Sequence, residues 1–268
     1  MKKSAIVLLA IALFTVVSYT RAVASPASRT FTGSGQSNVS SEKGVILKAS
    51  ATFTISNDVD LIIALSNIST NAPKTTSDIL TGLFFDISTN LTLTPRSATV
   101  APGSKVVGPV LNYDGDVSGQ WAYTNNLPTG TSSKDAPGEY GLSDTKYSFF
   151  KKRDLFSHSK LPHTSPLSGV QFGITDMSEF AAKAQGSIKH ADLILYTIDL
   201  VLNGLPVNFT LDDITGCTFV FGTSAKQGKG IDISGEVVGQ LPEPSTVALV
   251  AMGLLGALAL VRSGARRR

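Results

Sequence analysis

The chain has 268 residues, of which 42% are apolar and 16% are charged. This balance is typical of a folded protein with a sizeable core and excludes a largely disordered chain. The formal net charge is +3, but seven of the 23 basic residues lie near the ends: Lys2, Lys3, Arg21, Arg262, Arg266, Arg267 and Arg268. Without these and Glu243, the chain has 16 basic and 19 acidic residues, so we expect no nucleic-acid partner.

Residues 1–24 have the three parts of a secretory signal peptide. Lys2 and Lys3 supply a positive start, and an apolar run follows them from Ala5 to Tyr19. Ala22 and Ala24 are small residues at the two positions that a signal peptidase reads, so we predict cleavage after Ala24. An uncleaved anchor helix is the alternative for this segment.

The region between the two ends, residues 25–240, has the pattern of an all-β domain. Turn residues such as Asn57-Asp58 and Asn203-Gly204 separate short alternating runs, and Asn203-Gly204 suggests a hairpin. The polar segment 29–42 predicts a loose lead-in. We expect an antiparallel β-sandwich, jelly-roll-like, as the ectodomain. The predicted strands are 51–55, 60–68, 80–87, 91–100, 121–124, 147–150, 170–174, 193–202, 209–211, 217–221 and 231–238.

The body offers little chemistry that points to catalysis. The sequence contains no G-x-S-x-G pattern, and His158 and His163 lie in a segment rich in Ser and Pro. Asp212 and Asp213 are adjacent at a strand end, where neighbouring side chains face opposite ways. The single cysteine, Cys217, lies in a predicted buried strand, which predicts an inert thiol. We therefore expect no catalytic residues and no enzyme; a secreted hydrolase is an alternative without a named site.

Two pairs of residues are candidates for ligand binding. Trp121 and Tyr123 share one face of a predicted strand. If exposed, they would stack on a sugar ring, which makes a carbohydrate-binding module the alternative function; if buried, they belong to the core. Asp114 and Asp116 flank Gly115 and offer the oxygen ligands that Ca²⁺ prefers, without the spacing of an EF-hand. We expect no cofactor, with calcium at these two aspartates as the alternative.

The segment 241–268 has three parts again. Pro242-Glu243-Pro244 is held extended by its prolines. A predicted transmembrane helix, residues 246–261, follows, and the basic tail 262–268 carries Arg262, Arg266, Arg267 and Arg268, which resist crossing the bilayer. The apolar run from Val247 spans only about 22 Å as a helix against a bilayer core of about 30 Å. A short anchor of this kind suits removal, although a permanent single-span anchor is an alternative.

This order of proline motif, apolar helix and arginine-rich tail resembles the PEP-CTERM sorting signal. Proteins with that signal are substrates of exosortases, membrane enzymes of Gram-negative bacteria that make exopolysaccharide. The resemblance implies processing at or near Pro242-Glu243-Pro244 and delivery of the body outside the inner membrane. Segments 78–87, 119–123, 170–174 and 219–223 also resemble one group of exosortase-dependent surface proteins, which implies a single all-β ectodomain.

From these observations we expect an exported, non-enzymatic protein of the cell surface or extracellular matrix, associated with exopolysaccharide or biofilm. Its expected processing partners are signal peptidase and an exosortase, and its expected location is first the inner membrane and then the outside of the cell. Exopolysaccharide is the expected binding partner of the exported body.

Overall fold

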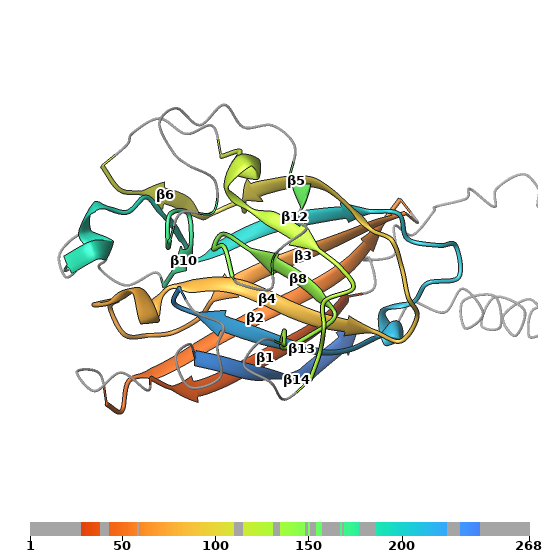
Figure 1. Ribbon diagram of the computed structural model, residues 1–268, viewed down its shortest axis with the longest axis horizontal. Helices are drawn as coiled ribbons and strands as arrows, with labels where there is room; N and C mark the ends of the chain where they lie inside the picture. Colours follow the sequence, from red (N-terminus) through yellow and green to blue (C-terminus); the bar gives the residue numbers. More distant parts are fainter. Residues whose placement is uncertain are drawn as a thin grey trace, which may run out of the picture. The chain divides into compact units, whose positions relative to one another are not determined.

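The strands of the body form two layers that pack against each other across one core (Figure 1). This computed structural model describes residues 28–37, 43–57, 59–109, 115–130, 135–147, 150, 154–156, 167, 169–176, 186–223 and 231–241. These residues fall within one compact unit, Pro26–Pro242. The predicted signal peptide, residues 1–24, and all residues from Pro242 onward lie outside the described ranges.

The described ranges contain 14 strands in one continuous sheet, and the helical elements within those ranges are short 3-10 turns. The strands are β1 (Ser28–Gln36), β2 (Ile46–Ser56), β3 (Asp60–Asn67), β4 (Leu80–Ile87), β5 (Thr94–Val100), β6 (Lys105–Val107), β7 (Ala122–Thr124), β8 (Tyr140–Ser143), β9 (Asp154–Leu155), β10 (Ile174–Thr175), β11 (Leu193–Leu195), β12 (Thr197–Asn203), β13 (Ile214–Phe221) and β14 (Ile231–Leu241). The turns are η2 (Thr76–Asp78), η3 (Ser118–Gln120), η4 (Gly186–His190) and η5 (Leu211–Asp213).

The strand order is β5-β12-β3-β2-β1-β14-β13-β4-β10-β11-β6, and β8 also pairs with β4 while β7 pairs with β8 and β9. Pairing is antiparallel except between β10 and β11. We call β5, β12, β3, β2 and β1 the meander layer, and β13, β4, β10, β11 and β6 with β7–β9 the covered layer. The all-β expectation is confirmed.

Strand β14 joins the two layers. Residues Ile231–Gly235 pair with β13 of the covered layer, whereas Glu236–Leu241 pair with β1 of the meander layer. The layers are therefore parts of one folded sheet, where the sequence predicted two separate sheets of a sandwich. The jelly-roll expectation does not describe this order either, because β1, β2 and β3 are neighbours in chain order and not joined by Greek-key connections.

The core between the layers is built from alternating residues of both. In β2 the side chains of Ala49, Ala51 and Phe53 point inward and are buried, while the residues between them are partly exposed. Phe53 meets Phe85 of β4 with ring centroids 5.6 Å apart. At about 25 cal/mol per Å² of buried apolar surface, such aromatic contacts dominate the stabilisation of the fold.

The strand β1 corrects the sequence prediction of a loose lead-in over 29–42. It pairs with β2 along its whole length, from Ser28 opposite Thr54 to Gln36 opposite Ile46. Gly33 and Gly35 of β1 carry no side chain because Ile233 of β14 lies over them: a Cβ added at Gly33 would come 2.7 Å from an Ile233 methyl carbon. These glycines suggest a loop in the sequence, but in the structure they leave room for the side chain of the neighbouring strand β14.

Other sequence predictions fail in detail. Tyr147 and Phe150 of the predicted strand 147–150 lie outside strands, and of the predicted strand 170–174 Ile174 alone lies in one, β10. Asn203-Gly204 ends β12 without a hairpin, since the neighbours of β12 are β3 and β5. The predicted strand 193–202 is divided into β11 and β12 at Tyr196, whose φ of 81° breaks the extended backbone. Residues 209–211 lead into the turn η5 instead of forming a strand.

Candidate functional site

The sorting junction, where the sheet meets the proline motif, lies at the end of β14. Leu241, the last residue of β14, pairs with Ser28, the first residue of β1. Pro242 follows Leu241 directly, and three residues, 25–27, lie between the predicted cleavage point after Ala24 and Ser28. In the sequence, both predicted processing points therefore lie next to the same end of the β1–β14 pair.

An ion pair fixes the β1 side of this junction. The Arg29 guanidinium donates to the Asp212 carboxylate over 2.8 Å and to the Leu211 carbonyl oxygen over 3.2 Å, and it lies 5.4 Å from the Phe31 ring centroid. The turn η5 is itself capped by Asp213. The hydrogen bond that this carboxylate accepts from the Thr210 backbone N–H holds the pKa of Asp213 below its ordinary value. The start of β1 is thus attached to a structured turn.

The comparisons with known proteins bear on this junction. Residues 240–268 match the family model of the PEP-CTERM protein-sorting motif. The chain therefore carries a PEP-CTERM sorting signal, as the resemblance through Pro242, Glu243, Pro244 and the arginine tail predicted. The signal implies an exported surface or extracellular protein that is targeted by an exosortase. Neither a curated protein nor a solved structure is significantly similar to the chain.

The match begins at residue 240, inside β14, so the PEP-CTERM signal overlaps the sheet by two residues. Pro242, Glu243 and Pro244, the arginines 262, 266, 267 and 268, and Ala22 and Ala24 lie outside the described residues. Within the described ranges, no helix is long and apolar enough to cross a membrane. The predicted helix 246–261 falls beyond those ranges and stays a prediction.

The structure corrects the prediction of a sugar platform at Trp121 and Tyr123. Both side chains face the core between the layers, with exposed fractions of 0% and 1%. The indole N–H of Trp121 donates to the Phe172 carbonyl oxygen over 3.1 Å. The two rings do share one face, as predicted, but that face is the inner one, where the strands of the meander layer lie over them.

The two calcium candidates, Asp114 and Asp116, have different outcomes. Asp114 lies outside the described residues, and Asp116 accepts a hydrogen bond from the Ser118 backbone N–H over 2.9 Å, at the start of η3. Asp116 thus serves a turn that leads into the buried Trp121. Across the described ranges, no group of three or more His, Cys, Asp or Glu side chains is placed to hold a metal ion.

The remaining sequence candidates have structural surroundings of their own. Asp212 pairs with Arg29, whereas Asp213 accepts hydrogen bonds from Thr210 and Ser88, so the two carboxylates serve different partners. Cys217 is buried in β13, as predicted, and burial raises the pKa of its thiol to about 12. His158 and His163 lie outside the described residues.

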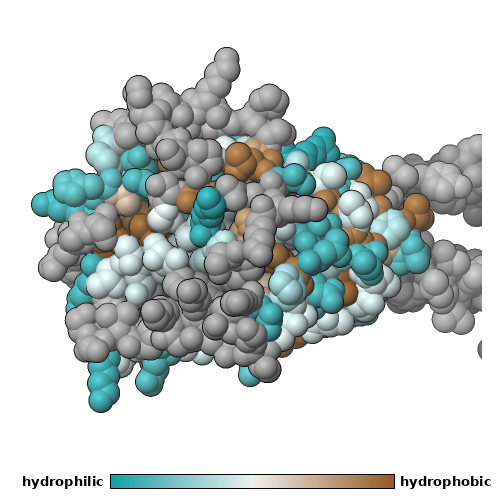
Figure 2. Space-filling view, viewed as in Figure 1, coloured by the Kyte–Doolittle hydropathy of each residue, from teal (hydrophilic) through white to brown (hydrophobic). Residues whose placement is uncertain are grey.

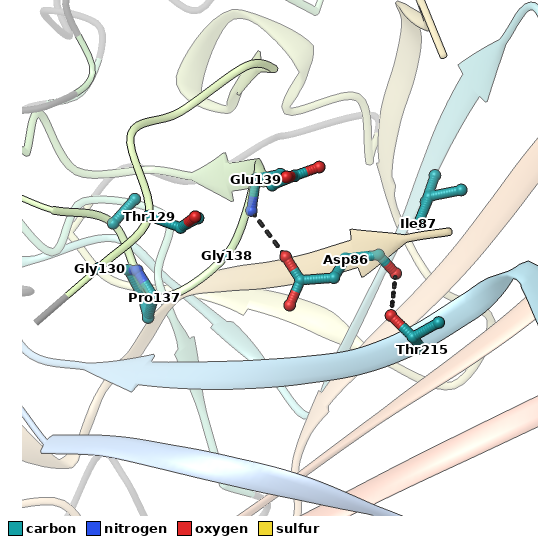
Figure 3. Close-up of a pocket in the computed structure, with 9 residues that line it drawn as sticks. Asp86, Ile87, Thr129, Gly130, Pro137, Gly138, Glu139 and Thr215 are labelled. Carbon is teal, nitrogen blue, oxygen red and sulfur yellow. Dashed lines mark hydrogen bonds between the residues drawn. The ribbon is translucent and has the colours of Figure 1, made fainter. Parts of the chain in front are cut away.

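One open pocket, with a volume of about 570 Å³, has polar walls that sequence reasoning missed (Figure 3). The Asp86 carboxylate accepts the Glu139 backbone N–H over 2.9 Å, and the Glu139 side chain extends away from it (Figure 3). The two carboxylates therefore do not converge on one point as an acid–base pair would. The pocket is lined by Asp86, Ile87, Thr129, Gly130, Ala136, Pro137, Gly138, Glu139 and Thr215.

The pocket walls come from β4, β13 and the segment before β8, which are far apart in the sequence. No local motif announces such a site, because only the pairing of β4 with β13 brings Asp86 and Thr215 together. The Thr215 hydroxyl donates to the Asp86 carbonyl oxygen over 3.5 Å. The carboxylates and hydroxyls of the pocket suit hydrogen bonds to a polar ligand.

Proposed function

We propose that this protein is an exosortase-processed, non-enzymatic component of the cell surface or extracellular matrix. The observation that carries the proposal is the PEP-CTERM match at residues 240–268, which starts at the end of the last strand of the sheet. A cut at or near Pro242-Glu243-Pro244 would therefore release the entire β-sheet body as one folded piece. In this proposal the β-sheet body is the part of the protein that is exported, and the C-terminal signal directs its sorting.

The proposed route has three steps. A signal peptidase cuts after Ala24. The apolar helix 246–261 then holds the chain in the inner membrane, with Arg262 and the following arginines on the cytoplasmic side. The exosortase cuts near the proline motif and passes the body to the surface or matrix. The apolar run is short for a bilayer, which suits a temporary anchor.

A structural role for the body is supported by how its conspicuous side chains are used. Trp121 and Tyr123 stabilise the core, Asp212 pairs with Arg29, and Asp116 accepts a hydrogen bond from the Ser118 backbone N–H. The described surface in the view of Figure 2 is mostly polar, with small apolar areas between polar ones. Such a surface suits a protein that is displayed in a hydrated matrix.

The intact mass of the mature protein tests the sorting proposal. In a strain with the exosortase, we expect loss of residues 1–24 and of everything beyond the proline motif. The matched control is Pro242→Ala with Glu243→Ala and Pro244→Ala, which should keep its tail, as should the wild-type chain in a strain that lacks the exosortase. A wild-type tail that persists through Arg268 beside an active exosortase would identify a permanent anchor instead.

The association with exopolysaccharide needs a separate measurement. We expect the mature body to co-sediment with exopolysaccharide from the same cells at low salt and at physiological salt. The burial of Trp121 means that stacking on this residue does not contribute, so the contact would use polar surfaces such as the pocket of Asp86 and Glu139. Failure to co-sediment would leave the sorting proposal intact and remove the exopolysaccharide part.

A further inference from the structure

The PEP-CTERM signal begins inside a closed strand pair. Leu241 pairs with Ser28, Gln240 with Arg29, and Gly239 with Thr30. We call the pairing of Ser28–Thr32 with Glu236–Leu241 the terminal ladder. Because Pro242 follows Leu241, no unpaired spacer lies between the terminal ladder and the proline motif.

The space on the other side of the motif is also short. Residues 242–246 separate the terminal ladder from the apolar run that starts at Val247. Even fully extended, these five residues span at most about 18 Å. An enzyme that binds an extended peptide forms main-chain hydrogen bonds along several residues of it. Upstream of the motif those residues are Gly239, Gln240 and Leu241, whose backbone is already paired with β1.

The two strands of the terminal ladder are held unequally. β1 pairs with β2 on its other side, and Arg29 attaches it to Asp212. In contrast, β14 beyond Gly235 has β1 as its one partner among the described strands. A register shift at Thr30/Phe31 interrupts the ladder opposite Val238, whose side chain is 65% exposed. Residues 239–241 are thus a short terminal segment, paired on one side, beyond an irregularity.

We propose that residues Gly239–Leu241 detach from β1 before the exosortase cuts, so that the stability of the terminal ladder sets the rate of C-terminal processing. The inference rests on the proposed exosortase cleavage and adds its regulation. Opening ends at Val238, where the ladder is already irregular, while Arg29 keeps β1 in the sheet. Terminal segments with few contacts open at a low free-energy cost, so the rest of the body stays folded during cleavage.

A disulfide lock tests this opening step in the full-length chain with its exosortase. Thr30→Cys with Gly239→Cys places two thiols directly opposite each other, and directly opposite antiparallel residues have the Cα separation that a disulfide needs. Cys217→Ala in the same chain removes the native thiol. In an oxidising periplasm, we expect cleavage, followed by pulse-chase and intact mass, to slow at least ten-fold and to recover when a reductant is added.

The matched control is a lock of the same chemistry elsewhere on β1. Ser34→Cys with Lys48→Cys joins β1 to β2 at directly opposite positions and leaves the terminal ladder free. This variant should be processed at the rate of the Cys217→Ala chain. Equal slowing of both locks would mean that disulfides hinder export or folding, and it would overturn the assignment of the effect to the terminal ladder.

A spacer supplies the opposite test. Eight Gly and Ser residues inserted between Leu241 and Pro242 should raise the cleavage rate several-fold and should restore cleavage in the Thr30→Cys, Gly239→Cys chain while its disulfide is intact. Cleavage of the locked chain at the normal rate without a spacer would overturn the proposal. A chain without any lock that is never cut beside an active exosortase would instead contradict the proposed function.

Discussion

The two layers of the sheet differ in what lies on their outer faces. In the meander layer, buried and partly exposed residues alternate along β2 and β12, so one face meets the core and the other meets solvent. In the covered layer, seven of the eight residues of β4 are buried. Phe85 faces the central core, whereas Phe84 belongs to a second cluster on the opposite face.

The second cluster explains the difference. β8 pairs with β4 within the sheet, and the segments that flank β7 and β8 cover the outer face of β4. Tyr147 and Phe150 of these segments bring their rings 5.9 and 6.1 Å from that of Phe84 (Figure 1). Alternation in the sequence therefore marks a strand with one solvent face, and a continuous apolar run marks a strand that is covered on both sides. The following predictions test whether the cover is as firmly packed as the core.

The largest expected effect comes from truncating one phenylalanine on each face of β4. Phe85→Ala should lower the free energy of unfolding by about 3–5 kcal/mol, because it leaves a cavity between the layers. If the cover is packed like a core, Phe84→Ala should cost about as much. Lys48→Ala, at an exposed position on the open face of β2 in the meander layer, is the control and should stay within about 0.5 kcal/mol. Denaturant unfolding measures all three, and a cost below about 1 kcal/mol for Phe84→Ala would show a loose cover.

Cys217 reports on opening of the covered layer. Its pKa is raised to about 12 by burial and by the nearby Asp86 carboxylate, against an ordinary value of 9.0. The thiolate is the reactive form, so alkylation of the folded protein at pH 8 should be about 1,000-fold slower than alkylation of the urea-unfolded protein. Mass spectrometry follows the label, and Cys217→Ala is the blank. Fast labelling of the folded protein would mean that β13 detaches readily.

Asp144 tests how much a buried carboxyl group in the covered layer lowers the stability of the protein. It lies directly after β8 with no exposed surface, and its Oδ2 has no hydrogen-bond partner among the described residues. Burial raises its pKa well above the ordinary 3.8. Since the folded pKa exceeds the unfolded one, the contribution of Asp144 to stability is full below pH 3.8 and is lost as the pH rises through the raised pKa.

Asp144→Asn should therefore stabilise the protein at pH 7 and make little difference at pH 3. The gain at pH 7 comes from removing the ionisable carboxyl, because the free energy of unfolding of the wild-type protein falls by up to about 1.4 kcal/mol for each pH unit above 3.8 until the raised pKa is reached. Thermal unfolding from pH 3 to pH 8 compares the two proteins, with Asp154→Asn at an exposed position of β9 as the control. A difference in stability between Asp144→Asn and wild type that does not change with pH would mean that Asp144 is not destabilised by ionisation.

The smallest expected effect concerns the surface of the meander layer. Asp212→Asn removes the ion pair with Arg29, but the Asp212 side chain is 71% exposed, so the loss should be about 0.2–1 kcal/mol. The loss should shrink further at about 1 M salt because exposed charges are screened. Arg29→Ala should cost more than Asp212→Asn, since it also loses the Leu211 hydrogen bond and the contact with Phe31. Equal costs for the two variants would show that the ion pair alone holds Arg29.

The regular parts of the fold follow from local pattern. The prediction 80–87 coincides with β4, and 60–68 differs from β3 by one residue. β1 was missed because Gly33 and Gly35 are required by the neighbouring Ile233, which no local pattern reveals. The pairing of β14 with β1 was equally hidden, because pairing between residues that are about 200 positions apart depends on the whole chain.

The candidate sites show the same contrast between what consecutive residues reveal and what depends on long-range pairing. The PEP-CTERM signal is readable because its parts are consecutive in the sequence and act by hydrophobicity and charge. The fate of Trp121 and Tyr123 depended on which face of their strand is covered, and alternation alone does not decide that. The pocket of Asp86 and Thr215 exists only through the pairing of β4 with β13.

The strand β14 also dictates the order in which the body is completed. β1 is the first strand of the described chain, yet one of its two partners is the last strand of the described chain. Until Glu236–Leu241 arrive, one edge of β1 has unsatisfied backbone groups and can pair with other chains. Pairing between residues about 200 positions apart forms slowly, so we expect the pairing of β14 with β1 to be among the last steps of folding. A chain interrupted during export would therefore present an open edge strand at its N-terminal end.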